Sequence, residues 1–187
     1  MEIAELIQDW REFYRRELEI QMPDTPFIPK PQDGFERLII VAPQLTHRKV
    51  IRALEERFGV FCHYKVHGVD PDRIVVERDR MPDAAYGVWI RANVDADEEF
   101  ANLSANDLRA SKVAGITLLE RLLLELKRFV DTGRHCDVDS QTLCTGSRHC
   151  DGSSPCVCWE SPLGRLDINW VFPHIKGKSL RCRAVVA

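Results

Sequence analysis

The sequence predicts a mixed α+β protein in which helices alternate with short strands along the whole chain. Apolar residues recur at helical spacing in two long segments and alternate at strand spacing in several short ones. The 187 residues are 44% apolar and 29% charged, as in a globular chain that buries a core. We expect a small α/β sheet with helices over residues 1–95. Residues 96–187 should hold a buried leucine-rich helix and short antiparallel strands.

The first half should begin with an amphipathic helix over residues 3–20, because an apolar stripe of helical period runs from Ile3 to Leu18. Prolines then predict an extended connector. Thr46 has the chemistry of a cap for a second helix, which Gly59 would end. Short apolar runs predict strands over residues 36–42, 60–66, 73–77 and 86–92.

In the second half, Thr117 and Glu120 have capping-box spacing before a helix over residues 118–130, and Gly133 should end this helix. A second capping box begins at Ser104. The segment 165–172 alternates cleanly, and a closing strand is expected over residues 180–186. The residues expected to point inward are Val157, Trp159, Leu166, Ile168, Trp170 and Phe172. Cys156 and Cys158 would then lie on an opposite, exposed face.

Composition excludes several classes of function. The formal net charge of −3 gives no general attraction to nucleic acid. No run of roughly 20 apolar residues could span a membrane, and the acidic N-terminus does not have the layout of a secretion signal. We therefore expect a soluble, cytoplasmic protein whose partner is a protein or a small-molecule ligand.

The seven cysteines are an odd number and are expected to be free thiols. Cysteines and histidines are dense in the last third of the chain, which leaves a structural zinc domain or a metal-dependent enzyme open as the alternative function. No Cys-x-x-Cys pair, nucleophile elbow or phosphate loop is present. The leading expectation is therefore no enzyme activity and no cofactor. The candidate metal ligands are His135, Cys136, Cys144, His149, Cys150, Cys156 and Cys158.

From about Gly34 onward, the chain resembles a family of uncharacterised bacterial proteins, which implies no particular activity. The matching residues are 97–99, 102–106, 115–123, 132–135, 142–144, 146–148, 151–152, Trp159, Trp170, Pro173, 180–181 and Arg183. The segment 146–183 is also similar to the variable region of diversity-generating retroelement target proteins. In such proteins a reverse transcriptase copies a template with changes at adenines. This resemblance implies a C-type-lectin-like fold that displays the changed side chains as a binding surface.

The residue types in this segment agree with the second resemblance. Changing both adenines of an AAC or AAT codon gives codons that never encode Lys, Glu, Gln, Met or Trp. Glu160, Lys176 and Lys178 would therefore be unchanged positions. Phe172 is compatible but was expected to point inward. The predicted contact residues are His149, Cys150, Ser153, Ser154, Cys156, Cys158, Ser161, Asp167, Asn169, Val171, His174, Ile175, Gly177 and Ser179. The sequence thus favours a diversified ligand-binding protein.

Overall fold

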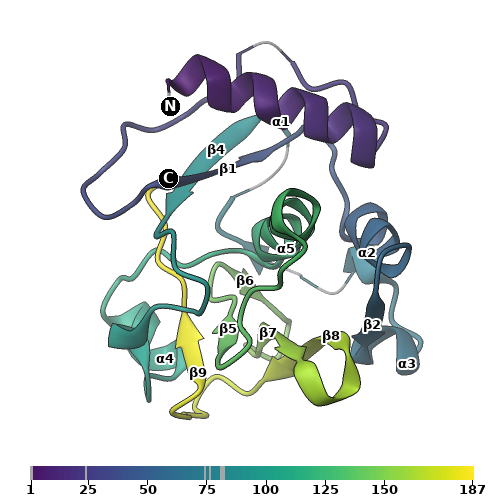
Figure 1. Cartoon of the computed structure of the whole chain (residues 1–187). Helices are drawn as coiled ribbons and strands as arrows, with labels where there is room; N and C mark the ends of the chain where they lie inside the picture. The colour runs from purple at the N-terminus through teal and green to yellow at the C-terminus, as the bar shows by residue number, and fades with distance from the viewer. Residues whose placement is uncertain (1, 24, 74, 76, 81–82) are drawn as a thin grey trace.

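A computed structural model describes residues 2–23, 25–73, 75, 77–80 and 83–187, and it confirms the mixed α+β class (Figure 1). The helices are α1 (Ile3–Glu17), α2 (His47–Glu55), α3 (His63–Val66), α4 (Ala105–Ala110) and α5 (Leu118–Thr132). The strands are β1 (Arg37–Val41), β2 (Gly59–Cys62), β3 (Glu77–Arg78), β4 (Tyr86–Ile90), β5 (Gln141–Leu143), β6 (Ser147–Arg148), β7 (Ser154–Glu160), β8 (Arg165–Val171) and β9 (Leu180–Cys182).

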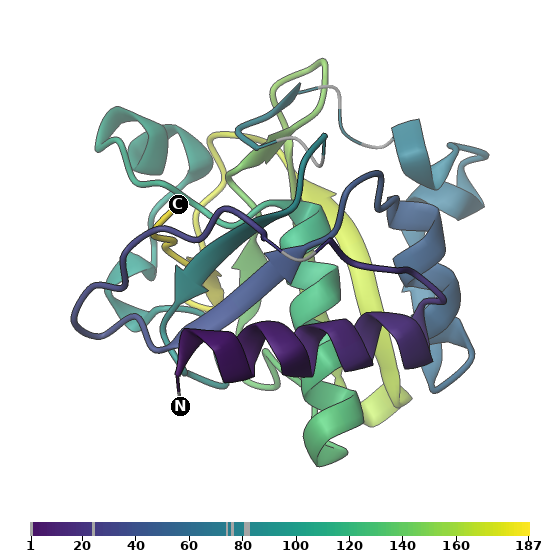
Figure 2. The same cartoon turned by 90° about the horizontal axis from the view of Figure 1, so that it is seen from above.

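The elements are stacked in layers around α5. Figure 1 shows α1 above the antiparallel pair β1–β4, α5 in the middle, and a five-stranded sheet below. Seen from above, α1 runs across α5 (Figure 2). The sheet has the order β2-β8-β7-β5-β9, with β2 parallel to β8 and β5 parallel to β9. A separate short pair joins β3 to β6.

Helix α5 is the centre of the core, as its sequence predicts. The side chains of Thr117 and Glu120 each accept a hydrogen bond from the other's backbone N–H, which satisfies amides that the first turn leaves free. Gly133 ends the helix with φ of 66°, a left-handed conformation that glycine adopts without steric strain. The capping box at Ser104 is confirmed as well, at the start of α4.

One hydrophobic core joins the two halves of the chain. It includes Trp10 of α1, Ile39 of β1, Leu122 of α5 and Ile168 of β8, each at most 3% exposed. A smaller cluster lies between α4 and the far side of the five-stranded sheet. Within the described residues, no helix has the length and apolar character that crossing a bilayer requires.

Several predicted boundaries are wrong for physical reasons. Residues 63–66 form helix α3 rather than the end of a strand, because pairing with β8 stops at Cys62 opposite Ile168. Gly59 does not end α2. It begins β2, and Glu56 is the C-cap. Helix α1 ends at Glu17, earlier than expected.

Two strand predictions are also corrected. The final strand stops at Cys182, and only isolated bridges continue it, from Ala184 to Gly115 and from Val186 to Trp89. Of the strand predicted over residues 73–77, positions 74 and 76 lie outside the described residues. In that segment Arg73 belongs to a 3-10 turn, and β3 begins only at Glu77.

Candidate functional site

Strands β7 and β8 form a hairpin whose two faces have different roles. Val157, Leu166 and Ile168 point toward α5 and are fully buried in the main core. The alternate residues point the other way, because successive side chains of a strand lie on opposite faces. Their register places Cys158 opposite Asp167, Cys156 opposite Asn169 and Ser154 opposite Val171.

Helix α4 covers one end of this outward side. Cys156 packs there with Leu108 of α4, Leu143 of β5 and Leu180 of β9, and it is only 6% exposed. The expectation of an exposed Cys156 is therefore wrong, since strand alternation identifies a face but not the element that covers it. Burial also raises the pKa of its thiol, with the neighbouring Cys158 adding to the effect.

Toward β2, this side is bordered by α3, whose His63 contacts Asp167. We call this end of the side the open face and define it as Phe61 of β2, Cys158 of β7, and Asp167, Asn169 and Val171 of β8. Val171 also packs against the cluster under α4. Parallel pairing of β2 with β8 places Phe61 next to Asp167. All of these residues except Asp167 are partly exposed.

A histidine–carboxylate contact and a cation–π contact hold side chains around the open face. Asp167 Oδ1 lies 3.1 Å from His63 Nε2, and the guanidinium of Arg165 lies 4.3 Å from the ring centre of Phe61. Partial burial raises the pKa of Asp167, and His63 opposes this rise. Burial, with the nearby Asp167 carboxylate, raises the pKa of Cys158 to about 11, so its thiol stays protonated at neutral pH.

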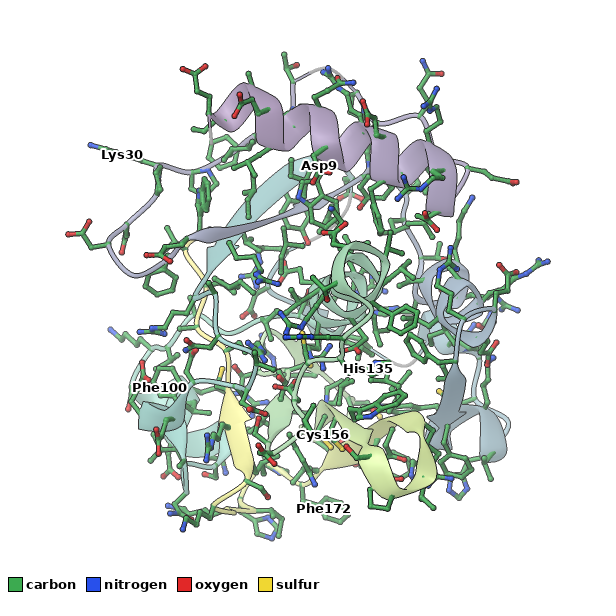
Figure 3. All side chains as sticks on the ribbon, in the orientation of Figure 1. Asp9, Lys30, Phe100, His135, Cys156 and Phe172 are labelled. Carbon is green, nitrogen blue, oxygen red and sulfur yellow. The ribbon has the colours of Figure 1, made fainter. Side chains whose placement is uncertain are left out.

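The loop after β8 extends the open face. Phe172 is 55% exposed, because β8 ends one residue before it, so the expectation that it points inward is wrong (Figure 3). The backbone N–H groups of Asn102 and Asn106 donate to the carbonyls of Gly177 and Pro173, at 3.1 and 3.0 Å. The remaining predicted contacts of this loop, His174, Ile175 and Ser179, are exposed.

Lys176 also anchors this loop. Its Nζ lies 2.7 Å from the Asp107 carboxylate of α4. This carboxylate belongs to the α4 capping box as well, and it accepts a hydrogen bond from the backbone N–H of Ser104 at 2.8 Å. Lys176, which is expected to be an unchanged position, therefore forms an ion pair with a residue of α4 outside the segment 146–183.

The other predicted contacts divide between surface and interior. Ser161 and Cys150 are exposed, and His149 is half-buried. Ser153 is 1% exposed and donates to Asp151 Oδ1 at 2.6 Å. Ser154 is fully buried and its hydroxyl accepts from Arg109 Nη2 at 3.0 Å. The structure thus brings together the open face and the loop, and it places Ser153, Ser154 and Cys156 inside.

The cysteines and histidines considered as metal ligands are dispersed. All seven cysteines are free thiols. Across the described part of the chain, no group of three or more His, Cys, Asp or Glu side chains is placed to hold a metal ion. His135 instead lies 2.9 Å from Glu125, and its ring is stacked on Trp159.

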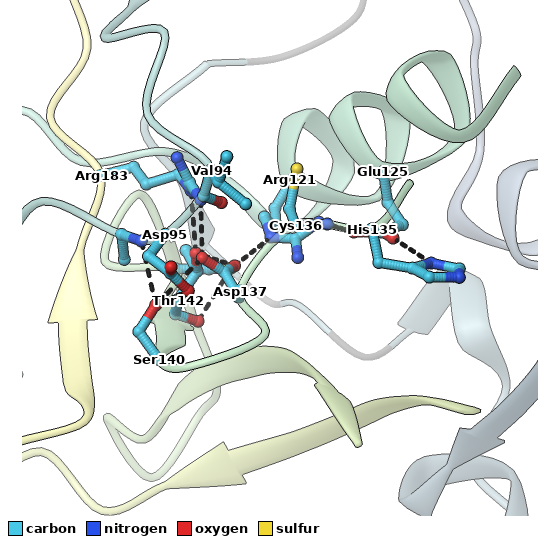
Figure 4. A network of polar contacts seen from close by, with 12 residues as sticks. Val94, Asp95, Arg121, Glu125, His135, Cys136, Asp137, Ser140, Thr142 and Arg183 are labelled. Carbon is cyan, nitrogen blue, oxygen red and sulfur yellow. Dashed lines mark hydrogen bonds and ion pairs between the residues drawn. The ribbon is translucent and has the colours of Figure 1, made fainter. Parts of the chain in front are cut away.

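Sequence reasoning missed a network of buried charges between α5 and the C-terminal segment (Figure 4). Asp137 accepts from Arg121 Nε at 2.8 Å and from Arg183 Nη2 at 2.6 Å, and all three side chains are at most 1% exposed. Arg121 also pairs with Glu125 at 2.8 Å. The charges that interrupt the apolar run of α5 were the available signal, because a charge on a buried helix face needs a partner.

This network holds the scaffold behind the open face. Arg183 donates to the carbonyl of Val94 at 2.6 Å, so it ties the end of the chain to the segment after β4. Although burial alone would raise it, the pKa of Asp137 is held below its usual value by the guanidinium groups of Arg121 and Arg183. The carboxylate therefore remains charged and keeps both arginines in place.

Comparisons of the chain with models of protein families, with curated proteins and with solved structures found no match.

Proposed function

We propose that this chain is a ligand-binding protein whose contact residues are diversified positions of the segment 146–183. One observation carries the proposal. Six of the predicted contact residues are partly or fully exposed on the open face or in the following loop: Cys158, Asn169, Val171, His174, Ile175 and Ser179. Ser153, Ser154 and Cys156 are buried, and Trp159, Trp170 and Lys176, which cannot be diversified positions, pack against the core or pair with α4. The similarity of this segment to retroelement target proteins supports the same function, and a C-type-lectin-like fold stays a prediction.

The open face has the physical properties that a variable binding surface needs. Its side chains are carried by paired strands rather than by a long loop, so substitutions change the contacts without changing the backbone. On the opposite side of the same strands, Val157, Leu166 and Ile168 are fully buried. A varied surface on such a rigid support binds in the manner of a paratope, through whichever side chains match the ligand.

The DNA around the gene tests this proposal directly. We expect a near-copy of the codons for residues 146–183 close to a reverse-transcriptase gene, differing only at adenines of the copy. The differing codons should include those of Cys158, Val171 and His174, whereas Asn169 should keep the AAC or AAT codon of the template. If no such copy exists, or if the differences fall at Val157, Leu166 and Ile168, the chain is not diversified in this way.

A library experiment tests the binding surface at the protein level. One displayed library varies Cys158, Asn169, Val171 and His174, and a matched library varies the inward-facing Val157, Leu166 and Ile168. Both are selected against the same arbitrary protein target. We expect folded binders from the first library alone, because its positions are partly or fully exposed, with only Val171 touching the smaller cluster, whereas those of the second library are fully buried in the main core. Equal yields from both libraries would contradict an assignment of binding to the open face.

A further inference from the structure

A pocket of about 280 Å³ lies between α3, the end of β8 and the loop before β7. Aromatic rings of Tyr64, His67, His149 and Trp170 form its walls, and Asp151 is also part of the lining. Pockets for drug-sized ligands usually have volumes of about 300–1,000 Å³. This aromatic pocket is therefore suited to one small chemical group rather than to an extended ligand.

The rings are held in a defined arrangement. Tyr64 is 2% exposed and its hydroxyl donates to the carbonyl of Asn169 at 3.3 Å. Its ring is stacked on that of His149, with centroids 5.2 Å apart and planes 7° apart. The ring of Trp170 lies 5.1 Å from Tyr64 and 5.7 Å from His67. Three elements thus fix the pocket before any ligand enters.

The described lining of the pocket holds one carboxylate beside two histidines. Asp151 is the one acidic residue among its described lining residues, and none of these is a lysine or an arginine. Its carboxylate accepts hydrogen bonds from the hydroxyl and backbone N–H of Ser153, which lower its pKa and keep it ionised. Burial lowers the pKa of His149, so this ring is neutral at pH 7.

We propose that the aromatic pocket binds an organic cation, an ammonium or guanidinium group, against the partly exposed ring of Trp170, which packs on Tyr64, with Asp151 as its counter-charge. Ring faces carry a negative partial charge that attracts cations, and alkylated ammonium and guanidinium groups lose less hydration on entering such a site than a bare metal ion does. Tyr64 and His67 precede the segment 146–183, and Trp170 cannot result from the adenine changes, so these three rings do not depend on diversification. His149 and Ser153 are predicted diversified positions, so this part of the lining rests on the proposed function.

A titration with choline and its neutral isostere 3,3-dimethylbutan-1-ol tests the proposal on the full chain. The reporter is the indole N–H signal of Trp170 in a nitrogen–proton NMR spectrum, assigned with the Trp170→Phe variant. We expect saturable binding of choline at least about fivefold tighter than that of the neutral alcohol. The proposal is overturned if choline and the neutral alcohol bind equally well. It is also overturned if neither choline nor N-acetyl-arginine amide gives saturable binding.

Two substitutions and a second probe complete the test. Asp151→Asn should weaken cation binding about fivefold while leaving the alcohol unaffected. Asp33→Asn, at an exposed position before β1, should change neither. Unchanged cation binding by Asp151→Asn contradicts the role of the carboxylate. N-acetyl-arginine amide distinguishes the two possible sources of the cationic group. If it binds more tightly than choline, the pocket is assigned to an arginine side chain of a protein ligand. If it binds more weakly, the pocket is assigned to a free ammonium compound.

Discussion

The carboxylate of Asp137 pairs with two arginines although neither it nor its partners are more than 1% exposed. Burying such charges is unfavourable unless each has a partner in good geometry. Once they are buried, removal of one partner leaves an uncompensated charge. Asp137, although it lies in an irregular segment, therefore connects α5 through Arg121 to the residues after β9 through Arg183.

Asp137→Asn should destabilise the protein by about 3–5 kcal/mol, because two buried guanidinium groups would lose their shared counter-charge. Urea unfolding followed by circular dichroism measures this loss. Asp139→Asn, at an exposed position two residues away, is the control and should change the free energy of unfolding by at most about 0.5 kcal/mol. Equal effects of the two substitutions would show that the network contributes no more than surface charge.

His47 provides a residue-level prediction for acid. It is 1% exposed, and no hydrogen bond to either ring nitrogen is found among the described residues. Burial, reinforced by the charge of Arg78, lowers its pKa to about 3. Since the unfolded pKa of histidine is about 6.5, the unfolded chain binds this proton more readily. Stability from His47 is therefore complete above pH 6.5 and declines as the pH falls toward 3.

At pH 5 this linkage amounts to about 2 kcal/mol of lost stability relative to pH 7. His47→Leu removes the titrating group. Between pH 7 and pH 5, the free energy of unfolding of this variant should therefore fall by about 2 kcal/mol less than that of the wild type. Urea unfolding of both proteins at pH 7 and pH 5 measures the difference. An identical pH dependence in wild type and variant would mean that the folded protein admits a protonated His47.

At the scale of elements, the start of α5 depends on a close backbone approach. Gly146, in the turn between β5 and β6, donates its N–H to the carbonyl of Ile116 at 3.1 Å. A Cβ at this position would lie 2.5 Å from the carbonyl oxygen of Gly115, closer than real Cβ contacts. Any side chain here would push β6 away from the residues that lead into α5.

Gly146→Ala should therefore destabilise the protein by about 1–3 kcal/mol. The matched control is Gly177→Ala, whose Cβ would meet its nearest neighbour, Leu180 Cβ, at an ordinary 3.5 Å. Thermal unfolding of the two variants measures the contrast, and only Gly146→Ala should lower the Tm by several degrees. A normal Tm for Gly146→Ala would mean that the turn shifts without strain.

Local signals were sufficient for some elements and not for others. The end residues of α5 follow from Thr117 and Gly133, because capping is decided within one helical turn. The helix at residues 63–66 could not be predicted, because the apolar run 60–66 also fits a strand. Its pairing with β8, about a hundred residues later, decides where the strand ends.

At the scale of the whole molecule, the two predicted regions share their core. Helix α5 packs on β1 and α2 of the first region and on β7 of the second. A chain of residues 1–95 would expose the apolar sides of β1 and α2 that α5 covers. The predicted regions are therefore described better as interdependent layers than as units that fold alone.

The fragment 1–95 should consequently lack a cooperative unfolding transition, whereas the full chain should show one. Circular dichroism during heating and the dispersion of amide NMR signals measure this difference. Adding the fragment 96–187 is the control, since it supplies α5 and should restore dispersed signals if both fragments remain in solution. A fragment 1–95 with a sharp transition of its own would establish an independent domain.

The sequence by itself determined the α+β class, the two long helices, the caps of α4 and α5 and the inward phase of Leu166 and Ile168. These features depend on residues within a few positions of one another, which a periodic pattern records. Only the tertiary structure decided the strand order, the cover over Cys156 and the partners of Asp137. Such features join distant segments, and periodicity says which face of a strand is apolar but not what will lie against it.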